Sequence, residues 1–530
     1  MLKFSLPAVS LILAVSLHAA PPAVNGLYPA GAQRGSTVEI TAIGTFDTWP
    51  VSVWTSSPHL TATAGKDKGK VTITVAADAP PGTYWIRCHD TQGSSGLRPF
   101  IVGGLPELQE SESNDTVAKS QQVTMPAMVN GKLNRNGDVD CYAVKLKRGQ
   151  TLVASVESHQ TLRSAGDMVM QLTNAAGTKL GQNHDYHGLD PRMVYTAKDD
   201  GVVIVRLFAF PANPDSSIRF AGGELYVYRL TVTVNGFADH ALPLAVQGAK
   251  PEPVRLVGWN LAPGSMAGTV MPRGERADVY HRETAGVVPV RLERWPTIDD
   301  TVPGQPPNAT LTAPVCITGQ LSREQPVYQT KIRLDKGKKF TVQVISPGLG
   351  LDVDPVLTIK DSTGKELLQA ETKGLHIDLN SSFTPTQEGV FTIMVRDLHK
   401  RHGTRMVFLL RVVPEVPHYE LTVNADRFTL TAGKPLDIPV TVISQAGFKE
   451  EVQLNVNGLP ASVTWKTVSS TGPADKKVIT IRLEGKETLS RGFEILGEVK
   501  GQPHLKKTAG ANVGELGIST SFLWLTCVKK

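Results

Sequence analysis

The sequence predicts an all-β protein built from tandem β-sandwich domains, and three observations lead to that fold class. Short stretches such as Thr151–Glu157 and Phe340–Ile345 alternate apolar and polar residues, a period of two that is typical of half-buried strands. The 48 Gly and 36 Pro are spread between such stretches, where they mark turns. Two segments recur later in the chain, and stretches long enough for the crossover helices of a parallel sheet are missing.

The first 19 residues have the pattern of an export signal. Lys3 supplies a positive charge, Leu6–Leu17 is apolar, and Ala19 offers a small residue at which cleavage is expected. An uncleaved membrane anchor is the alternative, but the apolar run is shorter than the ~20 residues that a spanning helix needs. We therefore expect an exported mature chain without a transmembrane segment, located in the periplasm, at the cell surface or outside the cell.

A first repeat predicts two small β units. Pro29–Gly44, with the sequence PAGAQRGSTVEITAIG, parallels Pro243–Gly258, with the sequence PLAVQGAKPEPVRLVG. The leading Pro, one Gln and the final Gly occupy equivalent positions in the two segments. The predicted units are an immunoglobulin-like sandwich over residues 20–104 and a shorter immunoglobulin-like unit over residues 237–300.

A second repeat predicts two larger sandwiches. GKLNR at Gly131–Arg135 matches GQLSR at Gly319–Arg323, and further on Asp167 and Asp354 stand at equivalent places. The predicted domains cover residues 105–236 and 301–414. A final sandwich is expected over residues 415–530, which repeats neither unit but again alternates, and which contains a segment similar to bacterial immunoglobulin-like domains, Gly447–Pro460.

The first larger domain resembles the bacterial pre-peptidase C-terminal domain. The resemblance rests on ESESNDTVAKSQQV at Glu110–Val123 and on the segment that begins GKLNRNGDVDCYAV at Gly131. The second copy resembles this family more weakly. Members are β-sandwich modules of secreted peptidases and other exported proteins, and the collagen-binding domains of clostridial collagenases are relatives. With the loop Phe208–Leu230, the domain combination also resembles large secreted proteins of planctomycetes and their relatives.

One acidic segment predicts a calcium site. On an extended chain, Glu110, Glu112 and Asn114 would lie on one side, and Ca²⁺ takes six to eight oxygen ligands. The resemblance to the collagen-binding relatives implies calcium at the same segment and at nearby aspartates. The alternative is a solvated linker that turns or caps a short helix at Val117. The candidate ligands are Glu110, Glu112, Asn114, Asp115, Asp138 and Asp140.

The second copy is expected to bind no calcium. It has Asn308 but no matching glutamates, and Arg323–Pro326 stands where the first copy has Asn-Gly-Asp. Two weaker candidates are the H-x-x-H pair at His184 and His187 and a group of rings that would form a recognition face unless they cover the core. Those rings are Phe208, Phe210, Phe220, Tyr226 and Tyr228.

No catalytic motif stands out, so the sequence favours a secreted noncatalytic protein that binds an extracellular or envelope polymer, either polysaccharide or protein. A structural scaffold of the cell envelope and a cryptic hydrolase or peptidase accessory subunit are the alternatives. The net charge of +6 comes without a dense basic run, which argues against nucleic acid. The four cysteines show no C-x-x-C spacing, so their pairing stays open: Cys88, Cys141, Cys316 and Cys527.

Overall fold

The computed structural model describes residues 19–213, 219–248, 254–301, 309–374, 376–470 and 475–529. Strands make up 57% of the structure and helices 3%, so the all-β prediction is confirmed. The predicted signal peptide, apart from Ala19, lies outside the described residues, and so does Asn308. Within the described ranges, no helix has the length and apolar character that a membrane crossing requires.

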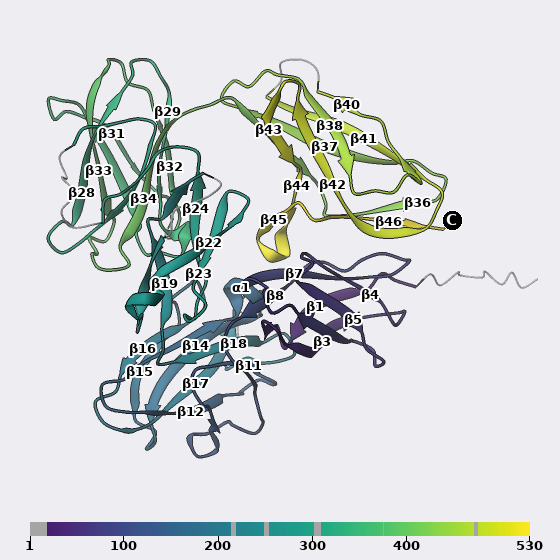
Figure 1. Ribbon diagram of the computed structural model, residues 1–530, viewed down its shortest axis with the longest axis vertical. Coiled ribbons are helices and arrows are strands. Elements are labelled where there is room, and N and C mark those ends of the chain that lie inside the picture. Colours follow the sequence, from purple (N-terminus) through teal and green to yellow (C-terminus); the bar gives the residue numbers. More distant parts are fainter. Residues whose placement is uncertain are drawn as a thin grey trace, which may run out of the picture.

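Two four-stranded sheets form the first sandwich (Figure 1). One sheet has the order β1 (Ala23–Tyr28), β3 (Thr37–Thr45), β6 (Lys70–Val75), β5 (Leu60–Ala64). The other has the order β2 (Gly31–Gln33), β8 (Arg98–Gly103), β7 (Gly82–His89), β4 (Ser52–Thr55). Every second residue of β6 is buried, because a period of two places alternate side chains between the sheets.

The second sandwich consists of two five-stranded sheets. One has the order β10 (Gln121–Gln122), β12 (Asp140–Leu146), β17 (Gly201–Pro211), β14 (Gly166–Asn174), β15 (Lys179–Asn183). The other has the order β16 (Arg192–Thr196), β13 (Thr151–Glu157), β18 (Val227–Thr233), β11 (Ala127–Lys132), β9 (Glu107–Gln109). Two short helices accompany them, η1 (Val117–Lys119) and α1 (His159–Leu162).

A single six-stranded arrangement follows the second sandwich. Its order is β19 (Phe237–Leu242), β21 (Val254–Trp259), β22 (Ala267–Arg273), β23 (Arg276–Tyr280), β24 (Val288–Glu293), β20 (Ala245–Gln247), and η2 (Pro263–Ser265) precedes β22. Gly44 and Gly258, which end the first repeat, have the same environment: a Cβ atom would lie 1.9 Å from the carbonyl oxygen of Ala23 and 2.0 Å from that of Phe237. The close approach of two backbones explains why both copies carry glycine here.

The fourth domain has the strand order of the second. One sheet has the order β25 (Thr297–Asp299), β27 (Val315–Gln320), β34 (Val407–Pro414), β29 (Phe340–Ile345), β32 (Leu379–Phe383). The other has the order β26 (Leu311–Thr312), β28 (Val327–Leu334), β33 (Gly389–Asp397), β30 (Pro355–Lys360), β31 (Glu366–Glu371), and η3 (Pro347–Leu349) takes the place of α1. The two larger domains are therefore copies of one fold.

Both copies also share an anchoring carboxylate that the sequence comparison did not single out. Asp190 accepts hydrogen bonds from the backbone N–H groups of Ser158, His159 and Gln160, and Asp378 accepts from those of Ser346 and Gly348. In each copy one carboxylate fixes the turn that follows the third long strand, because it satisfies N–H groups that the turn leaves unpaired.

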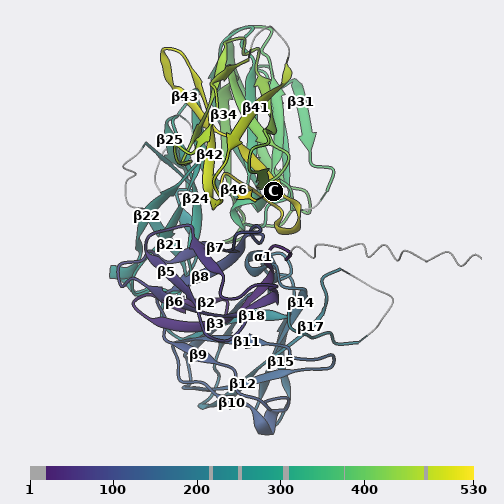
Figure 2. The ribbon, with the colours of Figure 1, turned by 90° about the vertical axis from the view of Figure 1, so that its right-hand side faces the viewer.

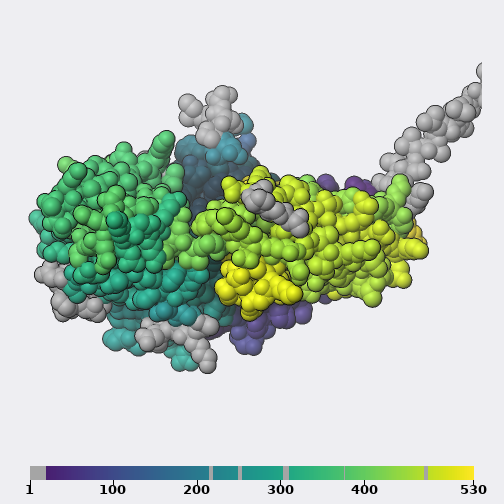
Figure 3. All heavy atoms as spheres, turned by 90° about the horizontal axis from the view of Figure 1, so that it is seen from above, coloured from purple at the N-terminus to yellow at the C-terminus, as the bar shows by residue number. Residues whose placement is uncertain are grey.

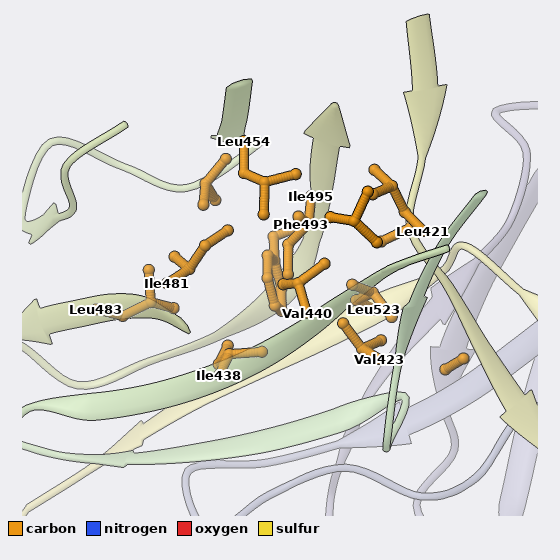
Figure 4. Close-up of a cluster of buried hydrophobic side chains, with 14 of the residues drawn as sticks. Leu421, Val423, Ile438, Val440, Leu454, Ile481, Leu483, Phe493, Ile495 and Leu523 are labelled. Atoms are coloured by element: carbon orange, nitrogen blue, oxygen red, sulfur yellow. The ribbon is translucent and has the colours of Figure 1, made fainter. Parts of the chain in front are cut away.

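The fifth domain packs two larger sheets around an apolar core. One has the order β39 (Val463–Thr464), β41 (Lys476–Gly485), β37 (Leu436–Gln445), β35 (His418–Val423), β44 (Gly510–Val513), β45 (Ile518–Thr520). The other has the order β36 (Arg427–Thr431), β46 (Leu523–Val528), β42 (Leu489–Val499), β38 (Val452–Asn457), β40 (Val468–Ser469), with β43 (Gln502–Thr508) beside β42 and η4 (Gly514–Leu516) before β45. Figure 4 shows Leu421, Val440 and Ile495 converging between the sheets.

The first and last domains contact each other, so the chain closes on itself. Figures 1 and 2 show the C-terminal sandwich against the N-terminal one, and Figure 3 shows it beside the fourth domain and above the first. The guanidinium of Arg87 donates to Asp426 at 2.8 Å, and its Cζ lies 5.5 Å from the Trp524 ring centre. Leu97 packs against Leu516. The five domains thus form a compact body rather than an extended string.

The four cysteine thiols are buried and unpaired. Burial raises the pKa of the Cys88 and Cys316 thiols to about 12, and it also raises the pKa of the Cys141 and Cys527 thiols. Thiolate is the reactive form of cysteine. These side chains therefore behave as small apolar residues of the core.

Candidate metal centre

Six oxygen-bearing side chains meet at one edge of the second sandwich. Glu110 directly follows β9, and Glu112, Asn114 and Asp115 lie on the segment that leads from it to η1. Asp138 ends the turn between β11 and β12, and Asp140 is the first residue of β12. Because β9 pairs with β11, the acidic segment is brought back beside the turn that carries the aspartates.

The carboxylates form two overlapping groups that share Glu112. Oxygen atoms of Glu110, Glu112 and Asp140 lie within 4.8 Å of one another, and so do oxygen atoms of Glu112, Asp115 and Asp138. The structure therefore brings together all five carboxylates that the sequence singled out. Asn114 is buried at the same place. The 3₁₀ turn η1 begins at Val117, as the linker alternative expected, but no side chain caps it.

Three of the carboxylates accept short hydrogen bonds, and Glu110 also accepts a longer one, at 3.5 Å, from the Asn134 amide through its other oxygen. The backbone N–H of Lys132 donates to Glu110 at 2.5 Å, and the backbone N–H of Asn134 donates to Asp138 at 2.6 Å. The Tyr228 hydroxyl donates to Asp140 at 2.5 Å. A carboxylate that is fixed through one oxygen can present the other to a ligand, so the cluster is preorganised.

Several buried oxygens of this cluster have no partner. Asp138 Oδ1, Asp140 Oδ1 and the amide oxygen and nitrogen of Asn114 make no hydrogen bond. Leaving a buried polar atom unpaired costs about 1–3 kcal/mol, and most folded proteins avoid it. Unpaired oxygens of acids and an amide, distributed over the two carboxylate groups, are what a bound cation would satisfy.

Mutual repulsion and burial disfavour the charged forms of these acids. Burial, followed by the charges of Glu112 and Asp138, raises the pKa of Glu110 to about 8. Burial raises the pKa of Asp140 well above its ordinary value, and the charge of Glu110 raises it further. Burial likewise raises the pKa of Asp138. Arg135 offers positive charge, at 3.4 Å from Asp115, but its side chain is 64% exposed and compensates little.

The donor set suits a hard cation. Carboxylate and amide oxygens bind Ca²⁺ in flexible, high-coordination geometry, whereas structural zinc sites are built from Cys and His. No Cys or His belongs to either carboxylate group within the described part of the chain. The ligands present therefore fit calcium.

The cluster lies close to the first domain. The Tyr28 hydroxyl donates to the backbone oxygen of Asn130 at 3.4 Å, and the Lys132 ammonium lies 5.3 Å from the Tyr28 ring centre. Burial, and after it the charge of Glu110, raises the pKa of Tyr28. The charge of Glu110, in the second domain, therefore affects the pKa of a side chain in the first domain.

The second copy replaces the carboxylate pair with a hydrogen bond from a tyrosine to one carboxylate. The backbone N–H of Asp300 donates to Thr318, as that of Glu110 does to Asn130, so Asp300 occupies the position of Glu110. Tyr328 occupies the position of Asp140, and its hydroxyl donates to Asp300 at 2.6 Å. The sequence comparison missed both substitutions, because Asp300 precedes the segment in which the match was recognised.

The weaker candidates do not form sites. His184 is exposed and pairs with Asp185, and neither it nor His187 joins a metal-type cluster in the described ranges. Phe208 and Phe220 stack with ring centres 4.3 Å apart, and Phe208 is buried. Tyr228 is buried as well, so these two rings belong to the core, as the alternative expected, whereas Phe210 is 36% exposed.

Comparison with known proteins adds little. No family model matches the chain, and no curated protein matches it. The pre-peptidase C-terminal domain of a collagenase from Bacillus anthracis is 15% identical over 21% of this chain and 99% of that one, with a TM-score of 0.16. Fibronectin(III)-like modules of CbhA from Clostridium thermocellum are 10% identical over 37% of this chain and 88% of that one, with a TM-score of 0.14.

A third similarity spans most of the chain. Domains 1–6 of surface layer protein SbsC are 10% identical over 96% of this chain and 54% of that one, with a TM-score of 0.15. All three scores are far below 0.5, so these similarities carry no argument about function.

Proposed function

We propose that this protein is an exported, noncatalytic binding protein whose second domain is stabilised by calcium. The observation that carries the calcium part is the set of buried, unpartnered oxygens among converging carboxylates, with Asp138 and Asp140 at its centre. A divalent cation bound at this cluster would satisfy unpaired oxygens and offset the burial and repulsion that raise the pKa of Glu110.

The proposed ligands divide into two kinds. Glu110, Glu112, Asp138 and Asp140 would supply carboxylate oxygens, and Asn114 would supply its amide oxygen. Asp115 is half-buried and already accepts hydrogen bonds from Arg135, so it would contribute least. Calcium bound here would fix the acidic segment against β12 and hold the entry to the second domain.

A binding role is supported over that of a spacer by the closed arrangement of the domains. A chain of spacers would be expected to separate its ends, whereas here Arg87 and Asp426 join the first domain to the last. A rigid body of sandwiches presents fixed surfaces to an extracellular polymer, and preorganisation reduces the entropy lost on binding. The proposal contains no catalytic step.

The calcium part is tested on the full chain, purified with a chelator and then titrated with calcium by calorimetry. We expect one saturable site and a rise in Tm. Replacing Glu110→Gln together with Glu112→Gln should lower the calcium affinity at least tenfold. Glu366→Gln with Glu371→Gln is the matched control, since both residues are exposed on β31, outside the cluster.

Two results would count against calcium. The first is the absence of both heat and a Tm change on adding millimolar calcium to the unsubstituted chain. The second is equal calcium affinity in the two double variants, which would place any bound ion elsewhere.

A further inference from the structure

A cavity of about 680 Å³ lies where four of the five domains meet. Typical ligand pockets measure about 300–1,000 Å³ and often lie between domains. Its lining includes Arg34 from the first domain, Glu157 from the second, Arg276 from the third and Gly350 from the fourth. None of the proposed calcium ligands lines it, so the cavity is separate from the metal centre.

One wall of the cavity is the outer face of a sheet in the second domain. Ser155 and Glu157 of β13 and Thr231 and Thr233 of β18 line the cavity. They alternate with side chains of the sandwich core, such as Val156. On an isolated sandwich this polar face would meet bulk solvent, whereas here the neighbouring domains enclose it.

The lining carries an excess of positive charge. Six guanidinium groups line the cavity, and those of Arg192 and Arg405 share one carboxylate, Asp239, while Arg405 also pairs with Asp352. Arg229 is paired with Glu107. For the side chains of Arg34 and Arg276, in contrast, the described part of the chain contains no carboxylate partner within ion-pair distance.

Burial disfavours the charged form of two acids in the lining, Glu157 and Asp190. Burial raises the pKa of Glu157, although the nearby guanidiniums of Arg229 and Arg192 act in the opposite direction. Burial also raises the pKa of Asp190 to about 7. The cavity therefore favours a ligand with negative charge.

The walls around these groups are rigid. The Tyr186 ring lies between two guanidiniums, with the Cζ atom of Arg192 at 4.7 Å and that of Arg405 at 4.4 Å from its centre. The Tyr186 hydroxyl donates to Asp239 at 3.2 Å. Since these residues come from the second, third and fourth domains, the cavity is held open in a fixed shape.

We propose that this cavity binds a short oligosaccharide that bears carboxylates, such as a chain of uronic acids. Guanidinium groups recognise carboxylates through paired N–H donors, and Arg34 and Arg276 would serve this role. Sugar hydroxyls both donate and accept hydrogen bonds. Side chains of the lining offer the same groups, including those of Thr161, Thr231 and Tyr280.

An acidic peptide fits the cavity less well. Peptides in grooves commonly pair their backbone with a free strand edge, and β13 and β18 have none, because β16 and β11 flank them in the sheet. The wall therefore offers side chains rather than backbone groups. This inference deepens the binding part of the proposed function and does not depend on calcium.

The test is a calorimetric titration of the full chain with trigalacturonate. The protein is first saturated with calcium and then freed of excess ion by gel filtration. We expect saturable binding to one site, and at least tenfold weaker binding of an uncharged galactose trimer. Arg34→Gln and Arg276→Gln should each weaken binding of trigalacturonate at least tenfold.

Arg323→Gln is the matched control, because it removes the same charge from an exposed turn of the fourth domain. Equal affinity in all three variants would overturn the proposal, and so would the absence of binding at millimolar trigalacturonate. Equal binding of triglutamate would overturn the choice of a saccharide. The Glu110→Gln, Glu112→Gln variant separates the two proposals, since it should lose calcium and still bind trigalacturonate.

Discussion

Glu110 and Asp140 of the second domain occupy the places of Asp300 and Tyr328 in the fourth. The backbone pairing of the two positions is the same in both copies, so the contrast depends on the side chains alone. Two carboxylates at this place repel each other and leave an oxygen of Asp140 without a partner. In the fourth domain the Tyr328 hydroxyl donates to Asp300 instead, so this position holds one carboxylate rather than two.

The stability of the calcium-free protein should fall as the pH rises. The pKa of Glu110 is about 8 in the folded chain against an ordinary value of 4.5, and the pKa values of Asp138 and Asp140 are also raised. The folded state therefore holds protons that the unfolded state releases between about pH 4.5 and pH 8, which favours folding at the acidic end of that window and disfavours it above.

Thermal unfolding with a chelator present should show this directly. We expect a higher Tm at pH 5.5 than at pH 8.5 for the chelated protein, with a loss on the order of 1–3 kcal/mol in the free energy of unfolding across the window. Saturating calcium should remove most of the difference. If the Tm of the calcium-free protein does not change with pH, folding does not raise the pKa values of these acids.

The residues at the metal centre were foreseeable only in part. The carboxylates were recognisable because acid and amide residues at this density suggest a cation whatever the fold. Tyr228 was not, because a tyrosine in a strand looks the same in sequence whether its hydroxyl meets water or a carboxylate. That Asp140 Oδ1 is buried and unpartnered depends on contacts between β12 and β18, which the sequence does not reveal.

At the scale of the strand, alternation and glycine explain the fold class. The period of two in stretches such as Thr151–Glu157 places one set of side chains inside each sandwich, and it could be read without a structure. The sequence showed only that the two repeats share certain residues, and it did not reveal that β1 and β3 approach each other closely. Gly44 shows their physical origin, since its backbone lies against the carbonyl group of Ala23.

Replacing Gly44→Ala should destabilise the first domain. The added methyl group would lie 1.9 Å from the Ala23 carbonyl oxygen, so β1 and β3 would have to separate, and overpacking of this kind costs about 1–3 kcal/mol. Hydrogen–deuterium exchange of the backbone amides of β1 and β3 would measure it. Gly104→Ala is the control, because a Cβ there meets no atom within 4 Å; equal loss in both variants would refute the explanation.

At the scale of the whole molecule, the contacts between domains were beyond the reach of sequence patterns. Arg87 and Asp426 are far apart in the chain, and neither stands in a recognisable motif. Another junction between domains is held by apolar contacts. Leu242 and Leu349 pack in one cluster between the third and fourth domains. The interdomain cavity exists because of these contacts, so its residues were equally invisible beforehand.

The closure between the first and last domains should depend on the Arg87–Asp426 pair. The side chain of Arg87 is fully buried and that of Asp426 is 11% exposed, and removing one partner of a buried ion pair typically costs about 3–5 kcal/mol. Asp426→Ala leaves Arg87 without its carboxylate and leaves the residues of the first domain intact. We expect the fifth domain to swing away, with a larger radius of gyration in small-angle X-ray scattering.

Arg482→Ala provides the control for this experiment. Arg482 pairs with Asp437 on the exposed surface of the same domain, and exposed pairs contribute about 0–1 kcal/mol, so its scattering should match that of the unsubstituted chain. Opening of the closure would also loosen one side of the domain assembly that encloses the cavity. Unchanged scattering from Asp426→Ala would instead show that the apolar contacts around Leu97 and Leu516 hold the two ends together without the ion pair.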